Sequence, residues 1–325
     1  MYLGLDVSKN TLDAALLEEG KAKPQHKVFA NTAAGHEQLL AWLGSKSAEP
    51  IHAALEATGT WAEAVALALH EAGHRVSLVN PARIHAFART QMARTKTDKA
   101  DSLLIARFAQ LHQPELWVPP AAAVRELQAL VRRLEALEEM RLMEENRLGS
   151  GGLTAAVQAS LREHITYLRE QIDKVKRQIK DHIDGNPGLK QQRDLLLSIP
   201  GVGETTAALL LAELGEVDRF DGARAVAAFA GLVPRIRQSG TSVRSRPRLS
   251  KVGSPRLRKA LYFPAITALR FNPLVRALGQ RLQEKGKPKM LIIGAAMRKM
   301  IHLAFGVLKS NRPFDPHFCA PALDG

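Results

Sequence analysis

The amino-acid sequence predicts an α/β domain, followed by a long helical arm and a mostly helical C-terminal region. Strand and helix patterns alternate through the first 110 residues, and helical periodicity then continues without strand patterns. Breaks rich in Pro or Gly, at Gln113–Ala123 and Asp184–Gly188, separate the three parts. A chain of 325 residues is long enough for two or three domains.

The first part is predicted from its strand patterns. Between Tyr2 and Val7, Leu3 and Leu5 lie on one face of a strand and Asp6 on the other. Short turns between the first three strands predict an antiparallel meander, and helical crossovers predict that the next two strands are parallel to their neighbours. The predicted strands are 2–7, 12–18, 27–30, 51–57 and 75–79, and the predicted helices are 33–43, 61–72 and 81 to about 111.

The middle of the chain predicts an α-hairpin or coiled-coil arm over residues 120–186. Apolar residues recur at helical spacing in two runs, which Leu148–Gly152 separates. A plain helical bundle is the alternative interpretation. We favour an oligomerising arm, because such a protrusion needs a partner to cover its apolar stripe. The two runs contain Leu127, Leu130, Leu134 and Leu137, then Leu153, Val157, Leu161, Ile165, Leu168, Ile172, Val175, Ile179 and Ile183.

Charge and cysteine content limit the class of protein. The net charge of +14 predicts a polyanionic partner, and residues 222–283 carry 13 basic side chains and no acidic one, which favours nucleic acid. Cys319 is the only cysteine, so the chain can form no internal disulfide or zinc cluster, and we expect a reducing compartment. The apolar segment Met290–Leu308 is interrupted by charges, and we expect it to be too polar to span a membrane.

Four carboxylates form the first candidate site. Asp6 and Glu56 lie at the ends of two predicted strands, and Asp98 and Asp101 are spaced to share one helical face. Such an arrangement suits Mg²⁺, which prefers hard oxygen ligands and acts on phosphodiesters. Each acid also has a plain interpretation: Asp98 and Asp101 complement a helix dipole, Asp6 caps a turn, and Glu56 is solvated.

The segment Ser198–Gly215 forms the second candidate site. Two helical patterns flank a Pro-Gly-Val-Gly turn, as in a helix-hairpin-helix that grips the nucleic-acid backbone without reading its sequence. Gly201 and Gly203 would let backbone N–H groups approach a phosphate. A simple helix-turn-helix hairpin without a ligand is the alternative.

The third candidate site is the basic segment Arg235–Tyr262, which holds no carboxylate. Ser239 precedes Gly240 there and is a nucleophile, a phosphate ligand or a plain loop residue; residue chemistry alone does not decide, and Thr241 or Ser242 would serve equally. Arginine binds phosphate in a bidentate manner and keeps its charge. The predicted nucleic-acid-binding cations are Arg235, Arg237, Arg244, Arg246, Arg248, Lys251, Arg256, Arg258 and Lys259.

Five stretches, in order, resemble the DEDD transposases of insertion-sequence family one hundred and ten. They are YLGLDVSKNTLDAAL, ALEATGTW, VNPARIHAFARTQMARTKTDKADSLLIARF, SIPGVGETTAALLLAELG and AFAGLVPRIRQSGTSVRSRPRLSKVGSPRLRKALY. The resemblance implies a RuvC-like, RNase H-like DEDD domain over 1–115 and a transposase domain with a serine nucleophile over 187–325. It makes Asp6, Glu56, Asp98 and Asp101 the Mg²⁺ ligands and Ser239 the attacking residue.

The same resemblance implies partners and a reaction. It implies a site-specific recombinase of a mobile element that forms a covalent phosphoserine link to DNA, with a structured non-coding bridge RNA pairing with donor and target DNA. A homo-oligomer, dimer or tetramer, in a prokaryotic cytoplasm is expected, with the acids of one subunit serving the serine of another and no membrane partner. The alternatives are a RuvC-like nuclease of branched DNA without a covalent intermediate, and a non-catalytic nucleic-acid-binding protein.

Overall fold

In the computed structural model the chain divides into two compact units, Met1–Pro119 and Pro120–Gly325. The structure describes residues 1–18, 20, 21, 23–57, 59–91, 97–235, 238, 239, 243, 244, 248–250 and 252–317. The finer division into 1–115, 120–186 and 187–325 remains a prediction.

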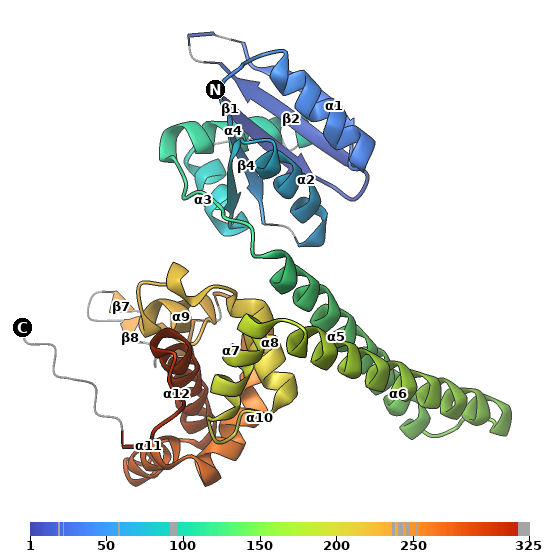
Figure 1. Cartoon of the computed structure of the whole chain (residues 1–325), viewed down its shortest axis with the longest axis vertical. Coiled ribbons are helices and arrows are strands. Elements are labelled where there is room, and N and C mark those ends of the chain that lie inside the picture. Colours follow the sequence, from blue (N-terminus) through green and yellow to red (C-terminus); the bar gives the residue numbers. More distant parts are fainter. Residues whose placement is uncertain are drawn as a thin grey trace, which may run out of the picture. The chain divides into compact units, whose positions relative to one another are not determined.

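A five-stranded mixed sheet forms the centre of the first unit, in the order β3-β2-β1-β4-β5 (Figure 1). β1 pairs antiparallel with β2, and β2 with β3, whereas β1–β4 and β4–β5 are parallel. The predicted meander and parallel crossovers are confirmed, and the topology agrees with the RNase H-like fold that the resemblance implies. The strands are β1 (Tyr2–Val7), β2 (Thr11–Leu17), β3 (Gln25–Ala30), β4 (His52–Glu56) and β5 (Arg75–Val79).

Helices cover both faces of this sheet. α1 (Ala33–Gly44) and α2 (Thr60–Glu71) pack on the face that carries Leu3 and Leu5. On the opposite face, α3 (Pro81–Thr90) and α4 (Asp98–His112) enclose a second core with Ala54 and Val79. The single helix predicted beyond residue 81 is therefore two helices, and Thr97 begins the second by accepting a hydrogen bond from the Ala100 backbone N–H at 3.2 Å.

The second unit starts with the helical hairpin of α5 (Ala122–Gly149) and α6 (Ala155–Asp184), which lie side by side (Figure 1). Their apolar stripes face each other, and Leu127, Leu134, Leu168 and Ile172 are at most 5% exposed. Our reason for expecting an oligomeric partner is therefore wrong, because the two helices of one chain already cover these stripes. The hairpin itself was correctly predicted.

The rest of the second unit is mostly helical, as predicted, with short strands that the sequence did not indicate. Its buried side chains form one core, which also includes buried side chains of α5 between Val124 and Leu137 and of α6 between Leu168 and Ile183. The elements are α7 (Pro187–Leu197), α8 (Glu204–Leu214), the 3-10 helix η1 (Val217–Arg219), α9 (Ala223–Phe229), β6 (Pro234–Arg235), β7 (Gln238–Ser239), β8 (Val243–Arg244), β9 (Arg248–Leu249), α10 (Pro255–Phe271), α11 (Pro273–Glu284) and α12 (Lys289–Ser310).

Helix α12 is long and apolar enough to cross a membrane, contrary to our expectation that its charges would exclude this. Its packing is nevertheless that of a core helix. Met300, Ile301 and Ala304 are fully buried and belong to the core of the second unit. The apolar character of the helix is thus explained by burial within the protein.

Candidate active site

The pairing of β1 with β4 brings Asp6 and Glu56 to the same end of the sheet. Gly4 pairs with Ala54 and Leu5 with Leu55 in a parallel register, and Asp6 and Glu56 are the next residues along the two strands. Side chains two residues apart lie on the same face of a strand, so both acids lie on the face of Gly4 and Ala54. This is the face that α4 covers.

Gly4 allows α4 to approach the sheet closely. A Cβ atom at this position would lie 2.1 Å from the Ser102 carbonyl oxygen and 2.3 Å from the Ala106 backbone nitrogen. Only a residue without a side chain fits there. Asp98 and Asp101 occupy the first turn of the same helix, so this contact sets how far their carboxylates lie from Asp6.

The carboxylates of Asp98, Asp101 and Glu56 act electrostatically on that of Asp6. Burial above all, and then the negative charges of Asp101, Asp98 and Glu56 in that order, raise the pKa of Asp6 from 3.8 to about 6. An isolated acid that caps a turn would not show these neighbours. Ser8, rather than Asp6, holds the following turn, since its hydroxyl accepts a hydrogen bond from the Thr11 N–H at 2.9 Å.

These carboxylates fit a divalent cation in chemistry but do not form a closed ligand shell. Within the ranges that the structure describes, no three His, Cys, Asp or Glu side chains are arranged to hold a metal ion. Hard oxygen donors with excess negative charge are what Mg²⁺ requires. Thr97 caps the helix that carries Asp98 and Asp101, so both acids also complement its dipole.

Asp13 is a fifth carboxylate of this site, which the sequence interpretation missed. It lies opposite Asp6 in the β1–β2 register and also raises the pKa of Asp6. Asp13 is 8% exposed, and one of its oxygens lies 3.0 Å from Nε2 of His26. Counting back from the turn at Ser8–Thr11 along both strands would have identified this pairing.

The glycine turn between α7 and α8 is built partly for packing. Gly201 has φ +104°, and a Cβ atom there would lie 3.0 Å from the Pro264 carbonyl oxygen on α10. Gly203 is exposed at the N-terminus of α8 and has open space around it. Of the two glycines, Gly203 is therefore the one with space for a phosphate, and the helix-hairpin-helix function stays a prediction.

Among the described residues of the basic segment are two short antiparallel strand pairs, β6–β9 and β7–β8, which together we call the ribbon. Arg235 lies opposite Arg248 in the β6–β9 pair, and Ser239 lies opposite Val243 in the β7–β8 pair. Ser239 is thus the last described residue of β7. The position of its hydroxyl, Gly240, Thr241 and Ser242 lie outside what the structure describes, as do Arg237, Arg246, Lys251 and the side chain of Arg244.

Three of the predicted nucleic-acid-binding cations have partners within the protein. Arg256 lies 3.4 Å from Glu135 and 3.5 Å from Glu213, and Lys259 lies 2.9 Å from Glu139. Arg258 donates to the carbonyl oxygens of Ala230 and Gly253, both at 3.1 Å. Although the basic segment contains no acid, Glu135, Glu139 and Glu213 from other helices of the second unit lie beside its cations. Arg258 holds the backbone on both sides of the ribbon, at Ala230 and Gly253.

Comparison with known proteins agrees with this geometry. Residues 193–280 match the family described as transposase IS116/IS110/IS902, and residues 3–151 match the transposases of the IS110 DEDD type. Pilin gene-inverting proteins of Moraxella bovis and Moraxella lacunata are each 34% identical over 317 residues, which is 97% of this chain and 97% of theirs. This chain belongs to the IS110 transposase family. The transposase for insertion sequence element IS1328 of Yersinia enterocolitica is 24% identical over 287 residues, covering 80% of this chain and 81% of that one.

Family membership makes this transposase an enzyme of DNA recombination. The family matches span both the acid-bearing sheet and the ribbon that carries Ser239. The two features that we singled out from residue chemistry thus lie in the segments by which the family is defined.

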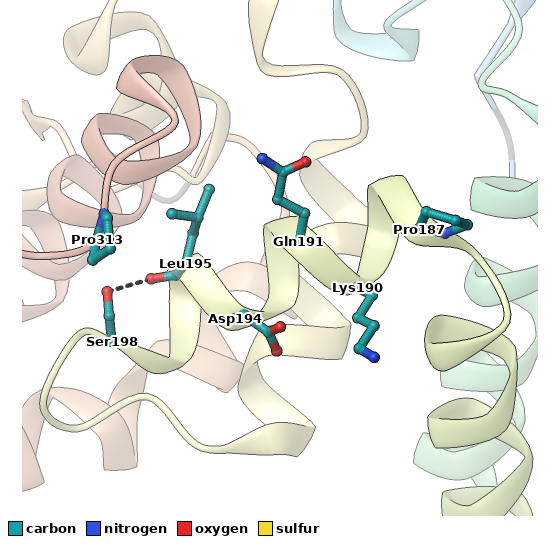
Figure 2. A pocket seen from close by; sticks show the side chains of 7 residues that line it. All are labelled: Pro187, Lys190, Gln191, Asp194, Leu195, Ser198 and Pro313. Carbon is teal, nitrogen blue, oxygen red and sulfur yellow. Dashed lines mark hydrogen bonds between the residues drawn. The ribbon is translucent and has the colours of Figure 1, made fainter.

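Two pockets in the second unit of the transposase do not include the candidate catalytic residues. One, of about 410 Å³, lies along α7, and Figure 2 shows Lys190, Asp194, Ser198 and Pro313 around it. The Ser198 hydroxyl there donates to the Leu195 carbonyl oxygen at 2.6 Å. The other, of about 510 Å³, lies between the arm and α10, near Phe263. Neither lining contains Ser239 or any of the four acids.

The exposed arginines of the ribbon yield the first testable prediction. Replacing both Arg235 and Arg248 with Gln weakens DNA binding about equally for all sequences, because phosphate contacts carry no sequence information. It also lowers the slope of log affinity against log salt concentration by about two, one per lost phosphate contact. Fluorescence anisotropy titrations with duplex DNA at several NaCl concentrations measure this slope.

The control is Arg169→Gln, which removes one positive charge from an exposed side chain of the arm that pairs with Glu145. It leaves the salt slope unchanged. A slope that is the same in the ribbon double variant and in the wild type would mean that Arg235 and Arg248 do not touch phosphate.

Proposed function

We propose that this protein is an RNA-guided, Mg²⁺-dependent, site-specific DNA recombinase that cuts and rejoins strands through a covalent phosphoserine intermediate on Ser239. The observation that carries the proposal is the gathering of Glu56, Asp98 and Asp101 around Asp6, whose pKa they help to raise to about 6. Costly like-charge clusters are typical of sites that bind a cation. The family match and the place of Ser239 within the basic segment, paired with Val243, further support it.

The proposed chemistry divides the work between two sets of residues. Asp6, Glu56, Asp98 and Asp101 would hold Mg²⁺, which when bound supplies charge stabilisation for a phosphodiester under attack. The Ser239 hydroxyl loses its proton as its oxygen forms a bond to phosphorus. The bond from phosphorus to the leaving deoxyribose oxygen breaks, and that oxygen takes up a proton, so the step neither gains nor loses a proton overall. Because the link to Ser239 conserves a phosphoester bond, rejoining to a second strand needs no external energy source.

The ribbon and the glycine turn would hold the DNA backbone. The exposed side chains of Arg235 and Arg248 lie side by side and suit a phosphate, whereas Gly203 offers an open helix N-terminus. Such contacts position a strand without reading its bases, so base pairing with a bridge RNA would choose the sites in donor and target DNA.

We further propose that the enzyme works as an oligomer in a prokaryotic cytoplasm, close to the nucleoid. The acids of one subunit would serve Ser239 of another, so that cleavage depends on assembly. Exposed apolar side chains at the distal part of the arm, Leu142, Met143 and Val157, support such an assembly, because 45–54% of their surface is open to solvent. Two of the relatives bear the name of gene-inverting proteins, so inversion of a DNA segment and transposition are both candidate outcomes of the strand exchange.

The test of the function is reconstitution. We expect RNA to copurify with the full-length protein, and the sequenced RNA to restore recombination between its matching donor and target DNA in the presence of Mg²⁺. Nuclease treatment of the RNA or chelation of the metal with EDTA abolishes the product. Recombination that survives ribonuclease treatment would exclude RNA guidance, and DNA that is cut but never rejoined would favour a RuvC-like nuclease.

A further inference from the structure

Asn31 connects the two segments that follow the acid-bearing strands. Its Nδ2 donates to the Ser8 carbonyl oxygen at 2.9 Å and to the Trp61 carbonyl oxygen at 3.2 Å. Its Oδ1 lies 2.9 Å from Nε2 of His36, a side chain that is 8% exposed. Ser8 follows Asp6 by two residues, and Trp61 follows Glu56 by five. The side-chain amide of Asn31 thus holds both segments at the end of the sheet where the acids lie.

The two segments carry an exposed aromatic side chain, Trp61, and an exposed cation, Lys9. Trp61 is 48% exposed although it is the largest kind of apolar side chain, and it lies in the first turn of α2. The ammonium group of Lys9, on the Ser8 loop, lies 6.0 Å from the centre of the Trp61 ring. Asn31 anchors the backbone of Trp61 and of Ser8, the residue before Lys9, so the backbone that carries both side chains is held in place although neither side chain is buried.

An indole and an ammonium group together match the chemistry of a single nucleic-acid strand. Bases stack on exposed aromatic rings whatever their sequence, because every base has an aromatic face, and lysine binds the neighbouring phosphate. A paired base within a duplex has its faces covered by its neighbours, so this contact requires an unstacked nucleotide. A nucleotide next to a phosphate under attack by a recombinase, on a strand displaced from its partner, meets this requirement.

We propose that Lys9 and Trp61 form a binding site for the DNA strand whose phosphate enters the acid site, with Trp61 stacking on a base near that phosphate and Lys9 contacting the phosphate beside it. This inference rests on the proposed function of the acids. Asn31 is the positioning residue, since it holds the segments that carry Lys9 and Trp61 near the strand ends of Asp6 and Glu56. The site is tolerant of sequence, as a recombinase that takes its sites from an RNA requires.

The test uses the full-length protein and a single-stranded DNA of about twenty nucleotides that carries iododeoxyuridine. Ultraviolet light joins this base to an aromatic side chain on which it stacks, and mass spectrometry locates the bond. In parallel, Fe²⁺ replaces Mg²⁺ and reduces added hydrogen peroxide, in the presence of ascorbate, to hydroxyl radicals that cut DNA beside the metal. The variants are Trp61→Ala, Trp61→Phe and Lys9→Ala. The control is Lys27→Ala, because the Lys27 ammonium group lies 5.1 Å from the centre of the Phe29 ring on edge strand β3.

The inference predicts a cross-link on Trp61 rather than on Trp42 or Trp117. Trp61→Ala lowers the iron-dependent cutting about tenfold at limiting DNA, as expected when the stacking of one base is lost. Trp61→Phe keeps the cutting within about twofold of the wild-type level. Lys9→Ala lowers it, and Lys27→Ala does not. Cutting that needs the acids but is unchanged in Trp61→Ala, without a cross-link on Trp61, would overturn this inference and leave the proposed function standing. Cutting that persists in the Asp6→Asn, Glu56→Gln double variant would overturn both.

Discussion

Replacing Gly4 with Ala is expected to separate the two halves of the acid site. The added methyl group would lie 2.1 Å from the Ser102 carbonyl oxygen and 2.3 Å from the Ala106 nitrogen, and both atoms belong to the backbone of α4. Backbone cannot rotate away as a side chain can, so the helix must move off the sheet. We expect a loss of about 3 kcal/mol in the free energy of unfolding, as for severe overpacking of a core.

The same change is expected to lower strand cleavage at least about a hundredfold in the molecules that still fold, because a shift of about 1 Å at a catalytic group has effects of that size. Asp98 and Asp101 move with α4, away from Asp6. Thermal unfolding and a cleavage assay measure the two effects. Gly44→Ala is the control, since its Cβ atom would meet nothing within 4 Å, and it leaves both quantities nearly unchanged. Wild-type stability in Gly4→Ala would show that α4 does not pack against β1 in this way.

Asp6→Asn is expected to abolish Mg²⁺-dependent cleavage and yet stabilise the protein in the absence of metal. Burial and the surrounding carboxylates hold the pKa of Asp6 at about 6, above its ordinary value of 3.8. The folded state therefore binds the proton more tightly than the unfolded state, and ionisation of Asp6 costs stability as the pH rises through this window. At pH 8 the Asp6 carboxylate of the wild type is ionised and lowers the free energy of unfolding by its full amount. The Asp6→Asn variant has no such charge and avoids this loss.

Thermal unfolding at pH 8 and near pH 4, with and without Mg²⁺, measures this effect. Without metal, Asp6→Asn raises the melting temperature by a few degrees at pH 8, and the gain shrinks near pH 4, where the wild-type carboxyl is protonated. Mg²⁺ stabilises the wild type more than the variant. Glu37→Gln, which removes an exposed acid from α1, is the control and changes little. A variant that is less stable than the wild type at pH 8 would show that Asp6 is not held among repelling charges.

The fold of the first unit was predictable because its elements are local. Alternation from Tyr2 to Val7 and the crossovers before strands 52–56 and 75–79 determine the order and direction of the strands. That order alone brings Asp6 and Glu56 to neighbouring strand ends. Asp13 was missed because its position depends on the register of a hairpin, which changes face with a shift of one residue.

Long-range partners and very short strands account for what the sequence did not show in the second unit. Glu139 meets Lys259 across 120 residues, and no local pattern links them. The ribbon around Ser239 consists of strands of two residues each, too short for alternation to be visible. The apolar stripes of the arm were correctly located, but only the structure reveals that α5 and α6 cover one another.

The most direct test of the account is a search for DNA bound covalently to Ser239. The complete complex of protein, its RNA and a nicked donor DNA that cannot be rejoined is denatured, digested and analysed by mass spectrometry. The account predicts a nucleotide phosphate on the peptide that contains Ser239, lost in Ser239→Ala and in Glu56→Gln, and retained when Thr241 and Ser242 are both replaced with Ala. Free DNA ends without any bound peptide, together with continued cutting by Ser239→Ala, would contradict it.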